Sequence, residues 1–181
     1  MLGKVEELKL IGECVLLDKR DSFGRLVEEY QDGLRSFLLN LTSGDVMLCE
    51  DLAQESFIKA YVNLRNFKGI SRFKTWLYRI AYNQYITHVN KEKPQAELEA
   101  ATSVASAFSH ASVDNSVDIK ECLKALNDTE RTVVTLFYLQ DMELKEISKI
   151  TQLNENTLKS HLLRGKRKMK TMLENDGYEK K

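Results

Sequence analysis

Short polar and basic side chains are concentrated in residues 155–173, where they alternate with apolar residues at helical spacing. At about 100° per residue, one side of a helix collects Leu158, Leu162, Gly165, Met169 and Leu173. The rest of the surface carries groups that donate hydrogen bonds or neutralise phosphates, namely Asn156, Thr157, Lys159, Ser160, His161, Arg164, Arg167 and Lys168. Short hydrogen-bonding groups come first and most of the cations follow, which suits base edges and then phosphates. We predict a nucleic-acid-binding helix, with an ordinary amphipathic helix and a solvated basic face as the alternative.

A second helix and a short polar turn come directly before this segment. Leu144, Ile147 and Ile150 fall at helical spacing. The turn 151–154 ends at Asn154, which can cap the next helix, and Glu155 places an acid in its first turn. Helix, short turn and helix is the pattern of a helix-turn-helix, whose second helix enters the major groove of DNA.

A second basic segment lies in the first half of the chain. We predict a helix over 72–91 whose core face holds Phe73, Trp76, Leu77, Ile80 and Ala81. Arg72, Arg79, Asn83 and Asn90 form an exposed stripe, and Tyr78, Tyr82 and Tyr85 form another. Arg and Asn can contact phosphates and base edges, and the tyrosines can either stack on unpaired bases or pack on a neighbouring helix. The preceding loop 66–71 contains Gly69 and could form a pocket for one extruded base.

Helices are also predicted over 5–17, 23–41 and 49–64, with Asp21 and Ser22 as the cap of the second. A turn covers 42–45. In the third helix the predicted inner stripe is Leu52, Phe57, Ala60, Tyr61 and Leu64, and the polar positions outside it are Asp51, Gln54, Glu55 and Lys59. Two further helices, from Ile119 to about Leu126 and over 129–139, precede the helix-turn-helix.

Residues 93–118 differ from the rest of the chain, because they contain the only Pro, are rich in Ala, Ser and Asp, and hold few large apolar residues. We predict a flexible linker, with at best a transient helix around 96–102. The predicted fold class is all-α, with two small helical modules, 1–92 and 119–181. Fully extended, the linker could separate them by some 85 Å.

The net charge of zero conceals separate charged blocks. Residues 65–93 hold seven Lys/Arg against one Asp/Glu, and 155–173 hold six against one, whereas 1–64 hold seven against twelve. Such blocks indicate separate surfaces for separate partners. The odd number of cysteines, Cys14, Cys49 and Cys122, predicts buried thiols in a reducing cytoplasm. No apolar run is long enough to cross a membrane, and we find no signal peptide, catalytic constellation, metal site or cofactor motif.

Four stretches resemble motifs of the bacterial extracytoplasmic-function (ECF) sigma factors, a branch of the sigma-70 family. Residues 50–57 (EDLAQESF) are similar to DLxQExF, and 73–83 (FKTWLYRIAYN) to WLxxIAxN. Residues 126–131 are similar to LPxxxR, and 144–168 to the family's helix-turn-helix. The resemblance covers about 19–92 and 119–173, in the expected order.

The resemblance implies a sigma factor that binds core RNA polymerase, recognises the −35 and −10 promoter elements, opens the strands and initiates transcription. The predicted helix 155–171 would read the −35 element through the eight residues given above. The −10 element would be read by Asn66, Phe67, Lys68, Gly69, Ser71, Arg72, Arg79 and Asn83. Polymerase would dock on Asp51, Gln54, Glu55 and Phe57. The family also implies an anti-sigma partner, no small-molecule substrate and a protein that is neither an enzyme nor itself a membrane protein.

Some positions depart from the family pattern. Asn127 replaces Pro, Gln152 replaces Gly in the turn, His161 replaces Arg, and Thr87 replaces Asp. We expect opposite charges to hold the modules of the free protein together and to mask the DNA-binding faces. The alternatives are a DNA-binding regulator that touches polymerase only weakly and a helical interaction domain or cysteine enzyme.

Overall fold

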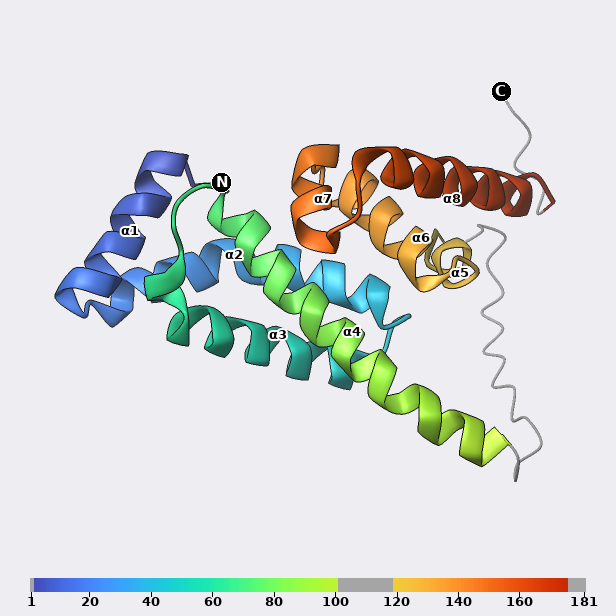
Figure 1. The fold of residues 1–181 in the computed structure, drawn as a ribbon, viewed down its shortest axis with the longest axis horizontal. Coiled ribbons are helices and arrows are strands. Elements are labelled where there is room, and N and C mark those ends of the chain that lie inside the picture. The colour runs from blue at the N-terminus through green and yellow to red at the C-terminus, as the bar shows by residue number, and fades with distance from the viewer. Residues whose placement is uncertain (1, 101–118, 176–181) are drawn as a thin grey trace.

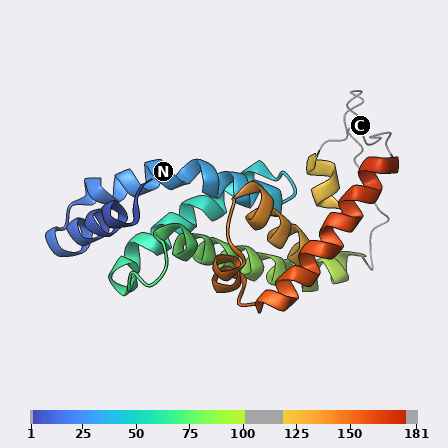
Figure 2. The same cartoon turned by 90° about the horizontal axis from the view of Figure 1, so that it is seen from above.

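The fold is known from a computed structural model, which describes residues 2–100 and 119–175. The first module contains α1 (Lys4–Leu17), α2 (Arg20–Leu41), α3 (Val46–Val62), the 3-10 turn η1 (Leu64–Asn66) and α4 (Phe73–Ala100). The second contains α5 (Ile119–Lys124), α6 (Asp128–Val134), the π-helical turn η2 (Thr135–Leu139), α7 (Leu144–Thr151) and α8 (Glu155–Asn175). The described residues form no strand, and the all-α fold with two helical modules is confirmed. Figure 1 shows the second module lying along α2 and α4, and Figure 2 shows the same pair of modules from above.

The start of α2 differs from the prediction. The helix begins at Arg20, so Asp21 and Ser22 lie in its first turn and do not cap it. Ser22 donates instead to the Glu13 carboxylate on α1 at 2.7 Å. The Ser22 hydroxyl thus joins α2 to α1, and local sequence does not reveal that its partner is Glu13. The turn before α3 does hold a cap, because the Asp45 carboxylate accepts from the Leu48 N–H at 3.0 Å.

Two residues of α3 lie further out than predicted. Tyr61 is 37% exposed and packs edge-on against Phe23, with ring centroids 5.0 Å apart. Phe57 is half-buried. The buried face is completed by small residues, Ala53 and Ser56, because α3 packs closely on its neighbours there. The Ser56 hydroxyl donates to the Leu52 carbonyl at 2.6 Å, which satisfies it inside the core.

The helix α4 is longer than predicted. It continues past Lys91 and through Pro94 to Ala100, so the predicted linker 93–118 begins inside a helix. The residues after Pro94, QAELEA, are strong helix formers, which explains the continuation. The rest of the predicted linker lies outside the described residues.

One hydrophobic core runs through both modules. It includes Phe37 of α2, Tyr78 of α4, and Leu136, Ile147 and Leu158 of the second module. The Phe37 and Tyr78 rings stack with centroids 5.1 Å apart. The modules of this state are therefore packed together.

Hydrogen bonds join the modules beside this core. The buried Tyr78 hydroxyl donates to the Gln140 side-chain oxygen at 2.7 Å, and Lys74 donates to the Gln140 carbonyl at 2.9 Å. Gly33 of α2 permits this approach, because a Cβ there would lie 2.8 Å from the Tyr78 hydroxyl. No ion pair joins described residues of the two modules. The prediction of contact is confirmed, and the charges of Glu146 and Asp141 attract Lys74 across it without a direct ion pair.

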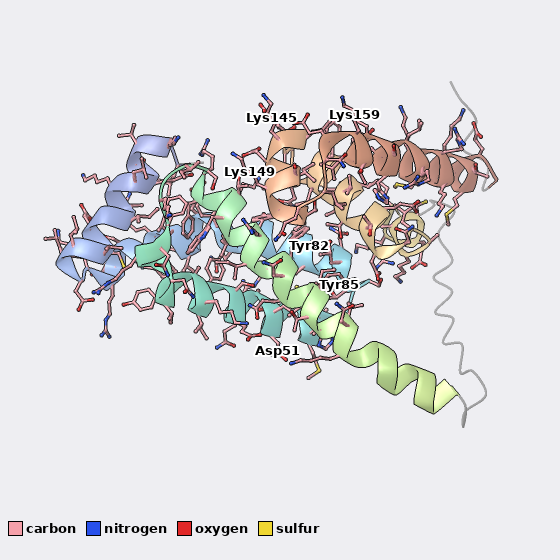
Figure 3. All side chains as sticks on the ribbon, in the orientation of Figure 1. Asp51, Tyr82, Tyr85, Lys145, Lys149 and Lys159 are labelled. Carbon is pink, nitrogen blue, oxygen red and sulfur yellow. The ribbon has the colours of Figure 1, made fainter. Side chains whose placement is uncertain are left out.

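The tyrosine stripe belongs to this contact. Tyr78 and Tyr85 are buried, and the Tyr85 hydroxyl donates to Asp128 of α6 at 3.4 Å. Figure 3 shows Tyr82 and Tyr85 on the part of α4 nearest the second module. In this state the tyrosines pack on neighbouring helices and do not form a platform for bases.

Arg131 fastens the second module to the first. Its guanidinium donates to the carbonyls of Leu123, Lys124 and Leu126 at 2.9–3.3 Å and to the Leu41 carbonyl at the end of α2 at 3.0 Å. Arg131 is only 8% exposed. The arginine of the LPxxxR-like segment is thus a buried donor that satisfies carbonyls at helix ends.

Candidate nucleic-acid interfaces

The helix α8 presents a polar face to solvent. The Asn154 side chain accepts from the Thr157 N–H at 2.8 Å, which caps the helix as predicted. Leu158 and Gly165 are buried against the module, whereas Asn156, Lys159, Ser160, Arg164, Arg167 and Lys168 are exposed and Thr157 and His161 are partly buried. The expected masking of this face is wrong, because the modules meet on other surfaces.

Two lysines of α7 extend the basic face. Lys145 and Lys149 are exposed one turn apart, and Figure 3 shows them with Lys159 along the outer edge of the second module. The same view places Asp51 at the opposite, lower edge of the molecule. Sequence reasoning concentrated on α8 and missed these two lysines. Their four-residue spacing on the outer face of the preceding helix was the signal that could have found them.

The turn between α7 and α8 holds Gln152 in a backbone conformation that is unfavourable for any residue other than glycine. Gln152 has φ 62° and ψ 14°, in the left-handed region, and its side chain is exposed. A side chain at positive φ costs on the order of 1–2 kcal/mol relative to glycine.

Gln152→Gly is expected to raise the free energy of unfolding by about 0.5–1 kcal/mol, since glycine's greater freedom in the unfolded chain offsets part of the relief. Urea denaturation of the full chain measures this change. Gln54→Gly, the same substitution at an exposed position inside α3, should have the opposite sign, about 1 kcal/mol less stable. Equal signs would contradict the strain at Gln152.

Two cations of α8 contact a buried acid on α6. The Glu130 side chain is 2% exposed. Its carboxylate pairs with the Lys168 Nζ at 2.7 Å and with the Arg164 Nε at 3.5 Å. Burial alone would raise the pKa of Glu130, but the Lys168 hydrogen bond and charge, the backbone N–H bond at Asn127 and the Arg164 charge lower it overall. Arg164 and Lys168 therefore do not lie freely on the outer face, and Glu130 is a residue that sequence reasoning missed.

Arg164 also contacts His161, the predicted base reader. The Arg164 Nη2 lies 3.1 Å from the His161 Nδ1. Partial burial, together with the Arg164 charge, lowers the pKa of His161, so its neutral form is favoured near pH 7.

The loop before α4 adjoins a cavity. Asn66 and Asn83 line a hollow of 390 Å³ whose other walls are Lys59, Asn63, Trp76, Ile80, Gln84 and Thr87. Phe67 packs on Trp76 with centroids 5.3 Å apart, and Gly69 has φ 69° beside Leu8 of α1. Lys68 is exposed and Ser71 partly buried. The structure thus brings Asn66 and Asn83 together at the cavity, but places it between α3 and α4 and not within the loop.

Arg72 is separated from the rest of its predicted stripe. Its guanidinium donates to the buried Glu7 carboxylate of α1 at 3.0 Å and to the Leu2 carbonyl at 2.8 Å. Glu7 also accepts from the Phe73 N–H at 3.3 Å and from the Tyr30 hydroxyl. Arg79 and Asn83 remain exposed. Glu7, which sequence reasoning missed, therefore anchors the loop and the start of α4.

The outer face of α3 combines acids with exposed apolar residues. Asp51, Gln54 and Glu55 are exposed, and apolar Met47, Ile58 and Val62 share this side. Half-buried Phe57, with Gln54 and residues of α2, lines a groove of 320 Å³. Such a mixture of acidic and apolar side chains suits a protein partner better than DNA.

The described residues contain no cluster of three His, Cys, Asp or Glu side chains suited to a metal ion. Within the same residues, no helix is both long and apolar enough to cross a membrane. The three cysteines are buried thiols, as predicted.

Comparison with known proteins identifies the family of this chain. Residues 26–95 match Sigma-70 region 2, and residues 116–169 match Sigma-70, region 4. The ECF RNA polymerase sigma factor SigW of Bacillus subtilis is 32% identical over 169 residues, covering 85% of this chain and 90% of the relative. The chain belongs to the ECF sigma factors. SigM of the same organism is 33% identical over 153 residues, 81% of this chain and 92% of the relative.

Two solved structures show the same fold. RpoE of Bartonella quintana, in complex with the anti-sigma factor NepR, superposes with a TM-score of 0.71 at 22% identity, over 84% of this chain and 96% of that chain. CnrH, in complex with the cytosolic domain of CnrY, gives 0.67 at 19% identity, over 96% and 98%. As a sigma factor, the protein acts with RNA polymerase in promoter recognition and transcription initiation.

Proposed function

We propose that the two modules of this ECF sigma factor divide promoter recognition between them, with residues 1–92 at the −10 element and 119–181 at the −35 element. The observation that carries this division is the presence of two separate exposed polar sites, the α8 face and the cavity beside Asn83. Polymerase supplies the catalysis, so the sigma factor itself is no enzyme, and it works in the cytoplasm.

At the −35 element, α8 lies in the major groove. Asn156, Thr157, Ser160 and His161 near its start meet base edges, and Lys159, Arg164, Arg167 and Lys168 meet phosphates. Support comes from the exposure of six of these eight side chains, all but Thr157 and His161, although Arg164 and Lys168 also contact Glu130. The Asn154 cap fixes the first turn of the helix. Lys145 and Lys149 of α7 add phosphate contacts on the same edge.

At the −10 element, the cavity between α3 and α4 accepts one base flipped out of the opening duplex. Its 390 Å³ volume is in the range of small-molecule sites, Trp76 offers an aromatic wall, and Asn66 and Asn83 offer amides that pair with base edges. Phe67, Lys68, Gly69, Ser71 and Arg79 surround the approach. Arg72 serves this site through Glu7, by holding the loop in place.

The outer face of α3 is the polymerase-docking surface. Asp51, Gln54 and Glu55 are exposed, although Glu55 also pairs with Lys59 at 3.0 Å, and Phe57 lines the adjoining groove. An anti-sigma factor is a further partner, as the complex of the structurally similar RpoE with the anti-sigma factor NepR suggests.

Replacing Asn83 by alanine is expected to lower open-complex formation about tenfold, because a base in the cavity loses an amide partner. Transcription reconstituted with core polymerase, with permanganate footprinting of the melted strand, measures the loss. Asn90→Ala, on the same helix but outside the cavity, is the matched control and should retain opening. Wild-type protein that bound promoter duplex but never restored transcription to core enzyme would instead identify a regulator that acts without joining polymerase.

A further inference from the structure

Three side chains form a connected series from the core of the second module to its DNA-binding face. Glu130 lies on α6, and its buried carboxylate contacts Arg164 of α8 at 3.5 Å and Lys168 at 2.7 Å. Arg164 continues to His161 at 3.1 Å. Gly165 lets α6 and α8 approach closely enough for this series, because a Cβ there would lie 2.7 Å from Val134.

The series determines which nitrogen of His161 carries the proton. A guanidinium has only N–H donors and no acceptor, so in this contact Arg164 donates and the His161 Nδ1 must accept. A neutral imidazole that accepts at Nδ1 carries its hydrogen on Nε2. Partial burial and the Arg164 charge oppose a second proton on the ring and lower the pKa of His161 overall, although the Glu130 charge acts in the opposite direction. The ring is therefore a hydrogen-bond donor at Nε2.

The other cations of α8 are not held in this way. Within the described residues, Lys159, Lys166 and Arg167 have no carboxylate within ion-pair distance, so their positions are not set by a buried charge. Glu130 thus acts on one flank of the helix, where it fixes Arg164 against His161.

We propose that Glu130 is a positioning residue which, through Arg164, holds His161 as an Nε2–H donor, and that the −35 element carries a hydrogen-bond acceptor where His161 meets it. This inference rests on the proposed function of α8 as the −35 reader. Guanine offers two acceptors in the major groove, N7 and O6, whereas cytosine offers its N4 amino donor. His161 therefore favours a base that offers an acceptor, guanine most of all because it offers two, and rejects cytosine at that position.

Nitrogen NMR tests the first half without DNA. In the full chain with ¹⁵N-labelled histidine at pH 7.5, the His161 signals, assigned by their loss in His161→Asn, should show a protonated Nε2 and a bare Nδ1. Arg164→Ala removes the donor and should give a mixture of tautomers. A protonated Nδ1 in the wild type, or an unchanged tautomer in Arg164→Ala, would overturn the proposal.

Selection of −35 sequences by reconstituted holoenzyme tests the second half. The wild type should prefer guanine over cytosine on the order of tenfold at one base pair, and Glu130→Gln and Arg164→Ala should reduce that preference to about two- or threefold there alone. Arg167→Ala, the matched loss of one unpaired cation, should weaken binding to all sequences and leave the preference intact.

Unchanged selectivity in both Glu130→Gln and Arg164→Ala overturns the positioning role even if holoenzyme selects promoters normally. Wild-type holoenzyme that selects no −35 sequence removes the proposed function of α8 itself, and the proposal with it. Because Arg164 is half exposed, its variant keeps the test open if Glu130→Gln fails to fold.

Discussion

A covalent bridge between Lys74→Cys on α4 and Asp141→Cys beside α7 is expected to abolish promoter-dependent transcription by the linked molecules. Only the fraction of protein that escapes crosslinking should remain active. The two elements lie about 25 base pairs apart, or about 85 Å along a duplex that rises 3.4 Å per base pair. Even α4, with 28 residues, is only about 42 Å long at 1.5 Å per residue. Modules joined by a 2.7 Å hydrogen bond between Tyr78 and Gln140 must therefore separate before both elements are read.

The bridge is made with a short, cleavable bismaleimide, and run-off transcription with core polymerase is measured before and after cleavage. Lys74 reaches the Gln140 carbonyl at 2.9 Å, so the two positions are close enough to link. The native Cys14, Cys49 and Cys122 are buried and should not compete. A bridge between Glu6→Cys and Arg25→Cys, an exposed pair inside the first module, is the matched control and should leave transcription intact. Full activity of the linked modules would mean that the closed arrangement itself fits the promoter.

Arg131→Ala is the second change with a large expected effect, a loss of about 3–5 kcal/mol of stability. The substitution leaves the carbonyls of Leu41, Leu123 and Leu126 without their guanidinium donor in a site that admits little water. Because a domain of ordinary stability has only about 5–15 kcal/mol in total, the second module should lose its cooperative fold near physiological temperature.

Thermal unfolding by circular dichroism, with proteolysis to locate the unfolded part, measures this loss. Arg25→Ala is the control, since Arg25 pairs with Glu6 at 2.9 Å on the surface and exposed pairs contribute about 0–1 kcal/mol. Arg131→Ala with the same melting curve as Arg25→Ala would show that the carbonyls find other donors.

The helix-turn-helix could be predicted in detail because its determinants are local. The spacing of Leu144, Ile147 and Ile150 and the cap at Asn154 involve residues a few positions apart. The left-handed backbone at Gln152 is the conformation that favours glycine, which is the residue that the family pattern places there. Helical periodicity likewise predicted the polar face of α8, on which six of the eight candidate residues are exposed.

Contacts across long sequence separations could not be predicted in the same way. The role of Tyr78 depends on Gln140, 62 positions later, and that of Arg72 on Glu7, 65 positions earlier. Glu130 looks like an ordinary first-turn acid of α6, and only the packing of α8 makes it a buried partner of Arg164 and Lys168. Helical periodicity gives the face of a side chain, but the neighbour on that face is set by tertiary packing.

The absence of a side chain at Gly33 has a consequence for how tightly polymerase can be bound. If only the separated form is competent, the apparent affinity for polymerase equals the intrinsic affinity multiplied by the fraction of separated molecules. A closed form favoured about 100-fold would weaken binding by about 2.7 kcal/mol. Because the Tyr78 hydroxyl lies where a methyl group at position 33 would make a 2.8 Å contact, one small side chain would shift that population. A side chain at position 33 is therefore expected to raise the apparent affinity of the proposed α3 docking surface without contacting polymerase.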